Sequence, residues 1–136
     1  MSDNTTWKPV VAAIIPRDAT ILVCQRTPHQ PFPLHWEFPG GKVEPGEPLP
    51  AALIRELHEE LAIHATIGPL LTTVRHRYAG GLGVELHFFL VPAFTPEPVN
   101  RIFHEIRWHP RATLDAAIFL EADQPIVRSL QRGELL

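Results

Sequence analysis

The sequence predicts an α/β (α+β) fold, a sandwich in which helices flank a mixed central sheet. The chain has 136 residues, the size of one compact unit, so we expect residues 1–136 to form a single domain. Short apolar segments rich in β-formers alternate with segments of strong helix formers, and this mixture favours layers of both kinds. The prolines cluster between these segments, so they mark loops rather than disorder.

The first half of the chain is expected to hold a hairpin, an aromatic strand and a helix. Residues 10–15 are continuously apolar, and residues 20–24 are β-rich and follow a short turn, which is typical of a β-hairpin. A proline-rich loop, residues 27–34, separates this hairpin from a short strand at 36–38. The strong helix formers of residues 51–61 then predict a helix, with Pro48 in its first turn.

The second half is expected to begin with two long strands, residues 66–78 and 84–92, joined at a glycine turn over residues 80–83. A further strand is predicted at 105–109. Two short helices, at 111–117 and 123–132, are expected to complete the fold.

Composition and charge exclude several classes of function. The formal net charge is −3, which leaves no large basic field to hold a long nucleic acid, whereas a small anion neutralised by metal ions fits this balance. A lone cysteine, Cys24, forbids an intrachain disulfide and a cysteine-rich zinc site. The chain has no apolar run long enough for a membrane span, and its polar N-terminus has no apolar signal core, so we expect a cytoplasmic protein with no membrane partner. The oligomeric state stays open between monomer and homodimer.

The predicted helix carries an unusual acidic arc beside its apolar stripe. Glu56, Glu59 and Glu60 are spaced i, i+3 and i+4, which makes them near neighbours. Like charges at these spacings destabilise a helix by roughly 0.2–0.5 kcal/mol per pair, so the arc is either a solvated face or a site for a strongly positive group. Carboxylate oxygens are hard ligands that suit Mg²⁺ or Mn²⁺. Arg55 is placed to pair with and orient one of the carboxylates.

The segment from residue 41 to residue 63 resembles the Nudix hydrolase family. That family carries the pattern G-x5-E-x7-R-E-U-x-E-E-x-G-U, where U is a bulky aliphatic residue. All its charged positions are filled here, and Ala62 stands where the family has glycine, which affects only the local turn. The flanking Trp-Glu-Phe-Pro-Gly-Gly-Lys run, residues 36–42, is similar to the MutT branch, which includes 8-oxo-dGTP diphosphatases and related nucleoside triphosphate pyrophosphohydrolases. The resemblance is weaker around Arg26 and residues 122–125.

The resemblance implies a Nudix-type α/β/α sandwich and a magnesium-dependent hydrolase. It implies that three glutamates and the carbonyl of Gly40 bind Mg²⁺, with Mn²⁺ as the alternative ion, and that Glu47 and Arg55 organise the loop and the helix. The three glutamates are Glu56, Glu59 and Glu60. The base that activates water is one helix glutamate or a water held by the metals. The MutT likeness alone implies hydrolysis of (deoxy)nucleoside triphosphates, oxidised ones such as 8-oxo-dGTP included, to monophosphate and pyrophosphate.

Several residues outside the helix are candidates for substrate binding. Arg26 and Lys42 would meet phosphate oxygens. A base needs a flat apolar slot with a few polar groups, and the candidates for that slot are Phe38, His76, Tyr78 and Asp123. Asp123 could instead cap the last helix, and His76 and Tyr78 could be a packed pair on one strand face.

A further glutamate occurs in several MutT-like proteins six residues before a strand tryptophan. If that tryptophan is Trp108, the position holds Ile102, and the nearest carboxylate is Glu105, either a metal ligand or a surface ion-pair partner. Two other functions stay open. One is a Nudix hydrolase of another substrate, such as a pyrimidine triphosphate, a nucleotide sugar or a dinucleoside polyphosphate. The other is a non-catalytic nucleotide-sensing module, which the complete set of glutamates disfavours.

Overall fold

The main sheet of the computed structural model, which describes residues 6–81 and 83–136, has four strands in the order β5-β1-β8-β7. The strands are β5 (Gly40–Lys42), β1 (Trp7–Ile14), β8 (Gly83–Leu90) and β7 (Leu70–Arg77). β1 and β8 run parallel over their full lengths, whereas the other two pairings are antiparallel, so the sheet is mixed as predicted. The parallel centre explains the continuous apolar run in β1, because both faces of this strand are covered.

A second sheet packs beside the first. It has the order β10 (Glu105–Pro110), β3 (Thr20–Gln25), β2 (Pro16–Arg17), and β4 (Trp36–Glu37) also pairs with β3. A two-stranded sheet joins β6 (His64–Thr66) to β9 (Ala93–Thr95). The pairing of β4 with β3 matters most for function, because it brings the loop before β4 and the turn after it to the edge of the main sheet.

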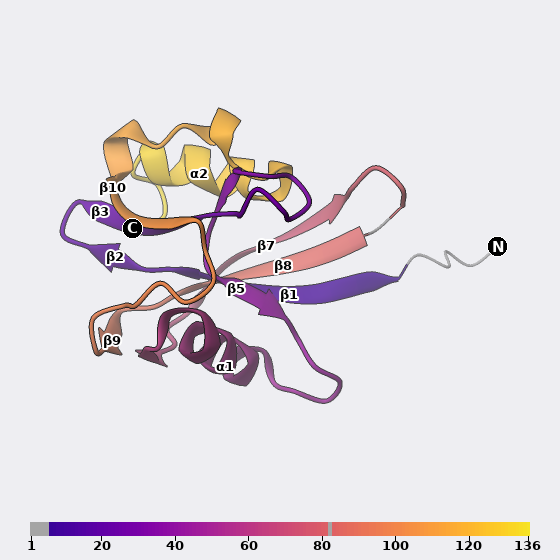
Figure 1. Cartoon of the computed structure of the whole chain (residues 1–136), viewed down its shortest axis with the longest axis horizontal. Helices are drawn as coiled ribbons and strands as arrows, with labels where there is room; N and C mark the ends of the chain where they lie inside the picture. Colours follow the sequence, from indigo (N-terminus) through magenta and orange to yellow (C-terminus); the bar gives the residue numbers. More distant parts are fainter. Residues whose placement is uncertain (1–5, 82) are drawn as a thin grey trace.

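The two helices lie on opposite sides of the β-structure in Figure 1, with α1 (Leu49–Leu61) below it and α2 (Gln124–Gln131) above it. Leu53, Leu57 and Leu61 of α1 are fully buried in a core that also contains Val11 of β1 and Ile15, the residue after that strand. On the other side, Ile126, Val127 and Leu130 of α2 pack into a separate core that contains Phe38, Phe88 and Phe119. The α/β/α sandwich with a mixed sheet is therefore confirmed.

Four sequence-based expectations about the elements need correction. The run 10–15 does not form a hairpin with 20–24 along its length: most of it is β1, which pairs with β8, and only the short β2 pairs with β3. The expected strand 66–78 is interrupted at Gly68, whose amide bonds to the Leu90 carbonyl, and at Pro69, which has no amide to donate.

The expected strand 84–92 ends at Leu90, and residues 93–95 form the separate β9. Residues 111–117 contain two 3₁₀ turns, η1 (Arg111–Thr113) and η2 (Ala116–Ile118), in place of one helix. A third 3₁₀ turn, η3 (Glu121–Asp123), leads into α2. Leu82 of the predicted glycine turn lies outside the described residues.

Candidate catalytic and nucleotide-binding site

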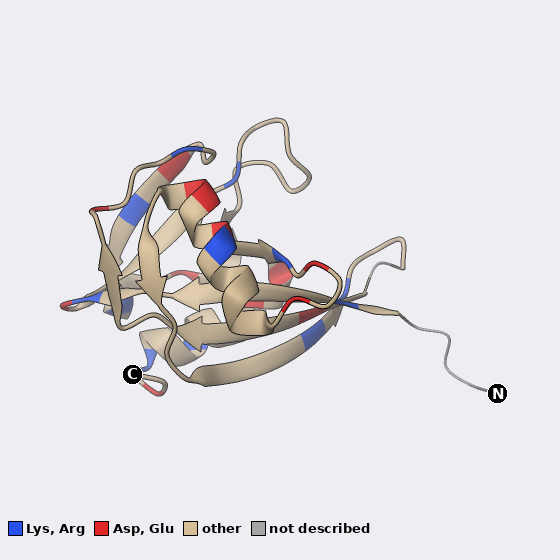
Figure 2. Ribbon diagram, turned by 90° about the horizontal axis from the view of Figure 1, so that it is seen from below, with Lys and Arg blue, Asp and Glu red and all other residues tan. Residues whose placement is uncertain are grey.

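Helix α1 presents its acidic side to the turn at β5 because its leucine stripe is held in the core. In Figure 2 the helix nearest the viewer, α1, carries acidic bands beside a basic one. The helix ends at Ala62, which adopts the left-handed conformation with φ 57° and ψ 33°, and its amide donates to the His58 carbonyl at 3.1 Å. Alanine therefore takes the backbone geometry that glycine would supply at the family's position.

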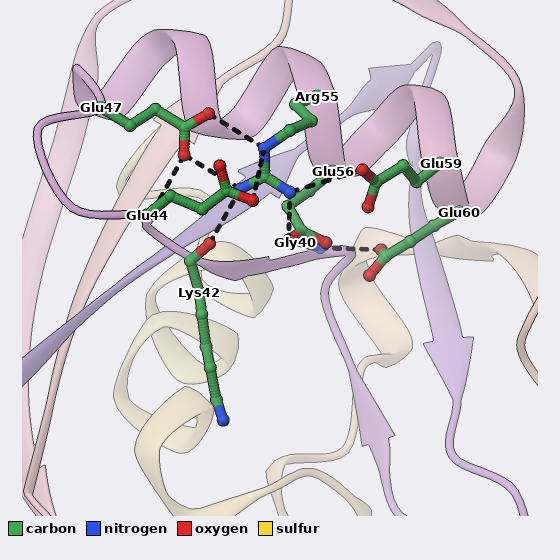
Figure 3. A network of polar contacts seen from close by, with 8 residues as sticks. All are labelled: Gly40, Lys42, Glu44, Glu47, Arg55, Glu56, Glu59 and Glu60. Atoms are coloured by element: carbon green, nitrogen blue, oxygen red, sulfur yellow. Dashed lines mark hydrogen bonds and ion pairs between the residues drawn. The ribbon is translucent and has the colours of Figure 1, made fainter.

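Arg55 connects the loop before α1 to the helix carboxylates (Figure 3). Its Nε and Nη2 donate to the two carboxylate oxygens of Glu47, each at 2.9 Å, which is the bidentate geometry that suits a guanidinium. Its Nη1 donates to Glu56 at 3.0 Å and lies 3.5 Å from Glu59. Nη2 also donates to the Lys42 carbonyl at 3.1 Å. The loop, β5 and the helix are thus held by one side chain.

Two glutamates approach the glycine pair from α1. The Gly40 amide donates to Glu60 Oε1 at 3.1 Å, and Glu60 is only 9% exposed. A Cβ on Gly41 would lie 2.4 Å from the carboxyl carbon of Glu56, so only glycine lets this carboxylate sit against β5. The Gly-Gly turn therefore makes a cradle for Glu56 and Glu60.

The electrostatics of this cradle fit a hard cation. Burial, together with the neighbouring charge of Glu56, raises the pKa of Glu60 to about 9, and burial also raises the pKa of Glu56. In contrast, its hydrogen bonds with Arg55 lower the pKa of Glu47 to about 2. Glu56 and Glu60 face each other as two hard oxygen donors whose mutual repulsion a divalent cation would relieve.

Glu59 completes the predicted set from a more exposed position. Its side chain is 57% exposed and leans toward Arg55 in Figure 3. Within residues 6–81 and 83–136, no three acidic, histidine or cysteine side chains already converge on one metal position. Glu56 and Glu60 supply two carboxylates beside the glycine turn, which is the type of donor that a divalent ion takes, and Glu59 lies three residues after Glu56 on the same helix.

A cleft extends from this cradle along Val10, Glu37 and Phe38. The end of the cleft beside the cradle, about 300 Å³, is also lined by Arg26, Lys42 and Glu60. Its other end, about 170 Å³, has an apolar lining of Ala12, Val84, Leu86 and Leu120 with Tyr78 and Asp123 as polar members. Because Glu37, Phe38, Gly40 and Gly41 line both parts, the two form one continuous surface.

The predicted phosphate-binding cations have different surroundings. Lys42 lies on β5, and in Figure 3 its side chain points away from the carboxylates. Arg26 is engaged by protein groups: its Nε donates to the Pro31 carbonyl at 2.8 Å, and its Nη1 donates to Glu37 at 3.2 Å. Lys42 is therefore the freer of the two to meet a phosphate.

The predicted base-binding residues meet at the apolar end of the cleft. Phe38 is buried and its ring stacks on Phe119 with centroids 5.4 Å apart. Asp123 precedes α2, but its side chain makes no cap hydrogen bond, so the alternative role as a helix cap is wrong. It is instead 3% exposed, accepts from the Phe38 amide, and burial raises the pKa of its carboxyl well above the usual range. Desolvation likewise raises the pKa of Tyr78 to about 12.

Two further sequence candidates have local partners. Glu105 lies on β10 and bonds to the neighbouring Arg107 at 2.9 Å, which is the surface ion-pair alternative. The His76 ring meets Tyr78 edge-on, with centroids 4.5 Å apart, so these two are packed as a pair.

Sequence reasoning missed Glu37 as a residue of the cleft. The alternation within β4 carried the signal, because Trp36 faces the core and Glu37 must face the other way.

Comparison with known proteins identifies the family. The NUDIX domain model matches residues 6–130. The chain belongs to the Nudix family. It is 35% identical over 122 residues to the 8-oxo-dGTP diphosphatase of Haemophilus influenzae, which covers 89% of each chain. It is also 47% identical over 85 residues to the CTP pyrophosphohydrolase of Escherichia coli, a match that spans 62% of each chain.

Solved structures show the same fold. The solution structure of the E. coli ORF135 protein has a TM-score of 0.81 and 35% identity, covering 94% of this Nudix chain and 91% of that chain. A MutT NUDIX hydrolase from Burkholderia pseudomallei has a TM-score of 0.82 and 29% identity, and the match covers 90% of this chain and 97% of that chain. The predicted Nudix and MutT-like resemblance is confirmed, and with it the enzyme class of the family. No helix in the described part of the chain is long and apolar enough to cross a membrane.

Proposed function

We propose that this Nudix protein hydrolyses (deoxy)nucleoside triphosphates, oxidised ones such as 8-oxo-dGTP included, to a monophosphate and pyrophosphate with Mg²⁺. The observation that carries the proposal is one cleft with two chemically different ends. One end holds Glu56 and Glu60 against the glycine turn, and the other is an apolar slot around the buried Asp123 carboxyl. A nucleotide has the same division into a polyanion and a flat base.

The residues at the phosphate end of the cleft would have three roles: holding the metal ion, orienting the carboxylates and contacting the phosphate oxygens. Glu56, Glu59 and Glu60 would hold the divalent ion, which supplies charge neutralisation on phosphate oxygens and acidifies attacking water when it is bound. The Gly40 amide fixes the Glu60 carboxylate, and Arg55 fixes that of Glu56. Glu47 in turn orients Arg55, so it acts through another side chain. Lys42 would meet phosphate oxygens at the cleft wall.

A second candidate substrate within the same reaction is a cytidine triphosphate. The slot measures about 170 Å³, and burial raises the pKa of its Asp123 carboxyl well above the usual range, which favours the protonated form of this group. A protonated carboxyl offers one donor and one acceptor, which complements the exocyclic amine and ring nitrogen of cytosine. The relative at 47% identity is named a CTP pyrophosphohydrolase, which supports this choice.

A substrate panel tests the reaction and the metal helix together. The panel compares CTP, dCTP, UTP, dGTP and 8-oxo-dGTP with a nucleotide sugar and a dinucleoside polyphosphate, with Mg²⁺ or Mn²⁺, and scores pyrophosphate against phosphate release. We expect pyrophosphate from triphosphates. Glu59→Gln and Glu60→Gln should each lose most turnover, whereas the surface substitution Glu134→Gln, in an ion pair with Arg132, should keep it. Full turnover in both helix variants would overturn the proposed metal site.

A second experiment concerns the base. Asp123→Ala removes both the donor and the acceptor that a protonated carboxyl offers to a base edge. We expect the ratio of kcat/KM for CTP and UTP to change, because the variant can no longer bond to either edge. An unchanged ratio would show that Asp123 does not select the base, while leaving the phosphate chemistry intact.

A further inference from the structure

An exposed aromatic side chain stands beside the base end of the cleft without a packing role in either core. Phe32 lies in the proline-rich loop, residues 27–35, and is 43% exposed. Its ring meets that of Tyr78, with centroids 5.2 Å apart and planes at 42°, and Tyr78 lines the base end. His76 meets the Tyr78 ring edge-on at 4.5 Å. Tyr78 is therefore held between a neighbour from its own strand end and one from the distant loop.

The loop is built to hold Phe32 in this position. Phe32 adopts φ 53°, a left-handed conformation that is unfavourable for a bulky side chain, so surrounding contacts must impose it. Those contacts are backbone bonds at both ends of the loop, where the Arg26 amide donates to the His35 carbonyl at 2.9 Å and the His35 amide donates to Phe32 at 3.3 Å. The Gln25 side chain also donates to the Leu34 carbonyl at 3.1 Å.

Arg26 ties the same loop to the cleft. It donates both to the Pro31 carbonyl, one residue before Phe32, and to Glu37, which lines both ends of the cleft. Its guanidinium is largely covered, with a side-chain exposure of 16%. A loop that is merely a connection needs neither a backbone in a costly conformation nor an arginine that fixes it to the site wall.

We propose that Phe32 is a positioning residue of the nucleotide site, which holds the Tyr78 ring at the base end of the cleft and thereby raises affinity for the nucleoside part of the substrate. The inference rests on the proposed function, because it assigns the base to that end. Phe32 acts through Tyr78 and takes no part in the chemistry at the glutamates. Its removal should therefore weaken nucleotide binding and leave the chemical step unchanged.

Tyr78 is the single tyrosine of the chain, so a tyrosine-labelled sample gives its ring signals alone in an NMR spectrum. The experiment titrates CMP and GMP into wild type, Phe32→Ala, Phe32→Trp and Leu34→Ala, and follows these signals, because tryptophan keeps an aromatic ring at position 32 without adding a second tyrosine. Leu34 is the matched control, since it is in the same loop, also has positive φ, and is 44% exposed. Steady-state kinetics with the best triphosphate of the panel accompany the titration.

We expect Phe32→Ala to shift the free Tyr78 signals and to raise both Kd and KM by about threefold to tenfold, the scale of one aromatic pair, with kcat unchanged. Phe32→Trp should keep values close to those of wild type, because it retains the aromatic contact, and Leu34→Ala should match wild type. Equal values for Phe32→Ala and Leu34→Ala would overturn the proposal, as would a fall in kcat with KM unchanged. Wild type that binds CMP or GMP without hydrolysing any triphosphate would refute the proposed function alone. Wild type that hydrolyses triphosphates while its Tyr78 signals do not respond to CMP or GMP would refute the inference alone.

Discussion

Ala62 offers a test of the end of the catalytic helix that does not depend on activity. This residue stands where the Nudix pattern has glycine, and it adopts φ 57°. A Cβ in the left-handed region costs roughly 1–2 kcal/mol. Glycine removes this cost but adds conformational freedom to the unfolded chain, which offsets about 0.5–1 kcal/mol. Ala62→Gly should therefore increase the free energy of unfolding by about 0.5–1 kcal/mol.

Calorimetry can resolve an effect of this size. The entropy of unfolding scales with chain length, so for 136 residues the increase corresponds to a rise in Tm of about 2–4 °C. Ala51→Gly is the matched control, because Ala51 is exposed in the same helix with ordinary helical geometry. There glycine should lower the free energy of unfolding by about 0.5–1 kcal/mol.

Opposite signs for the two glycine substitutions are the expected result, with kcat unchanged in Ala62→Gly. If both variants lose stability to the same extent, residue 62 is not in the left-handed conformation, and the account of the helix end is wrong. A gain in Tm together with a loss of activity would show that the alanine methyl itself supports the site.

Three further predictions concern the acidic cradle. Gly41→Ala should reduce kcat at least about tenfold, because a Cβ would stand 2.4 Å from the Glu56 carboxyl carbon and displace this carboxylate. Steady-state kinetics would check this, with the circular dichroism spectrum as the control for folding. Full activity would contradict it. Arg55→Lys should also lower kcat/KM by about tenfold or more, since an ammonium cannot reproduce the bidentate hydrogen bonds to Glu47. Activity equal to wild type would show that this bidentate contact is dispensable. The pKa of Glu47 is lowered from 4.5 to about 2, so its ion pair stabilises the fold above pH 4.5 and is lost as the pH falls toward 2. The difference in Tm between wild type and Glu47→Gln should accordingly close over that interval, and a difference independent of pH would refute the assignment.

The parts of the fold that follow from local chemistry were predictable. The leucine stripe and the acidic arc of α1 recur at helical spacing, so a short segment determines both the helix and its orientation. The pairing of strands was not predictable in the same way. β1 pairs with β8, about 75 residues later. The sequence of an apolar strand that is buried on both faces does not indicate which other strand it pairs with.

The same distinction divides the candidate site. Arg55, Glu56 and Glu60 lie within one motif, and the pairing of Arg55 with a helix carboxylate followed from their spacing, whereas the bond from the Gly40 amide to Glu60 did not. Glu37 was missed because its role depends on the pairing of β4 with β3, and Phe32 was missed because only the fold brings it to Tyr78. The inward turn of the Asp123 side chain also depends on tertiary packing, since a helix-capping residue has the same local sequence.

The two ends of the cleft are held together in different ways. The phosphate end is held by a single motif in which Arg55 joins Glu47 and Glu56, so a substitution there disturbs several partners at once. The base end is assembled from segments that lie apart in the sequence: the loop that carries Phe32, the end of β7 and the turn before α2. Changes in one of these segments can alter the slot without moving the carboxylates. Selectivity for the base should therefore vary independently of kcat among variants of Phe32, Tyr78 and Asp123, whereas variants of the motif should change kcat for every substrate by a similar factor.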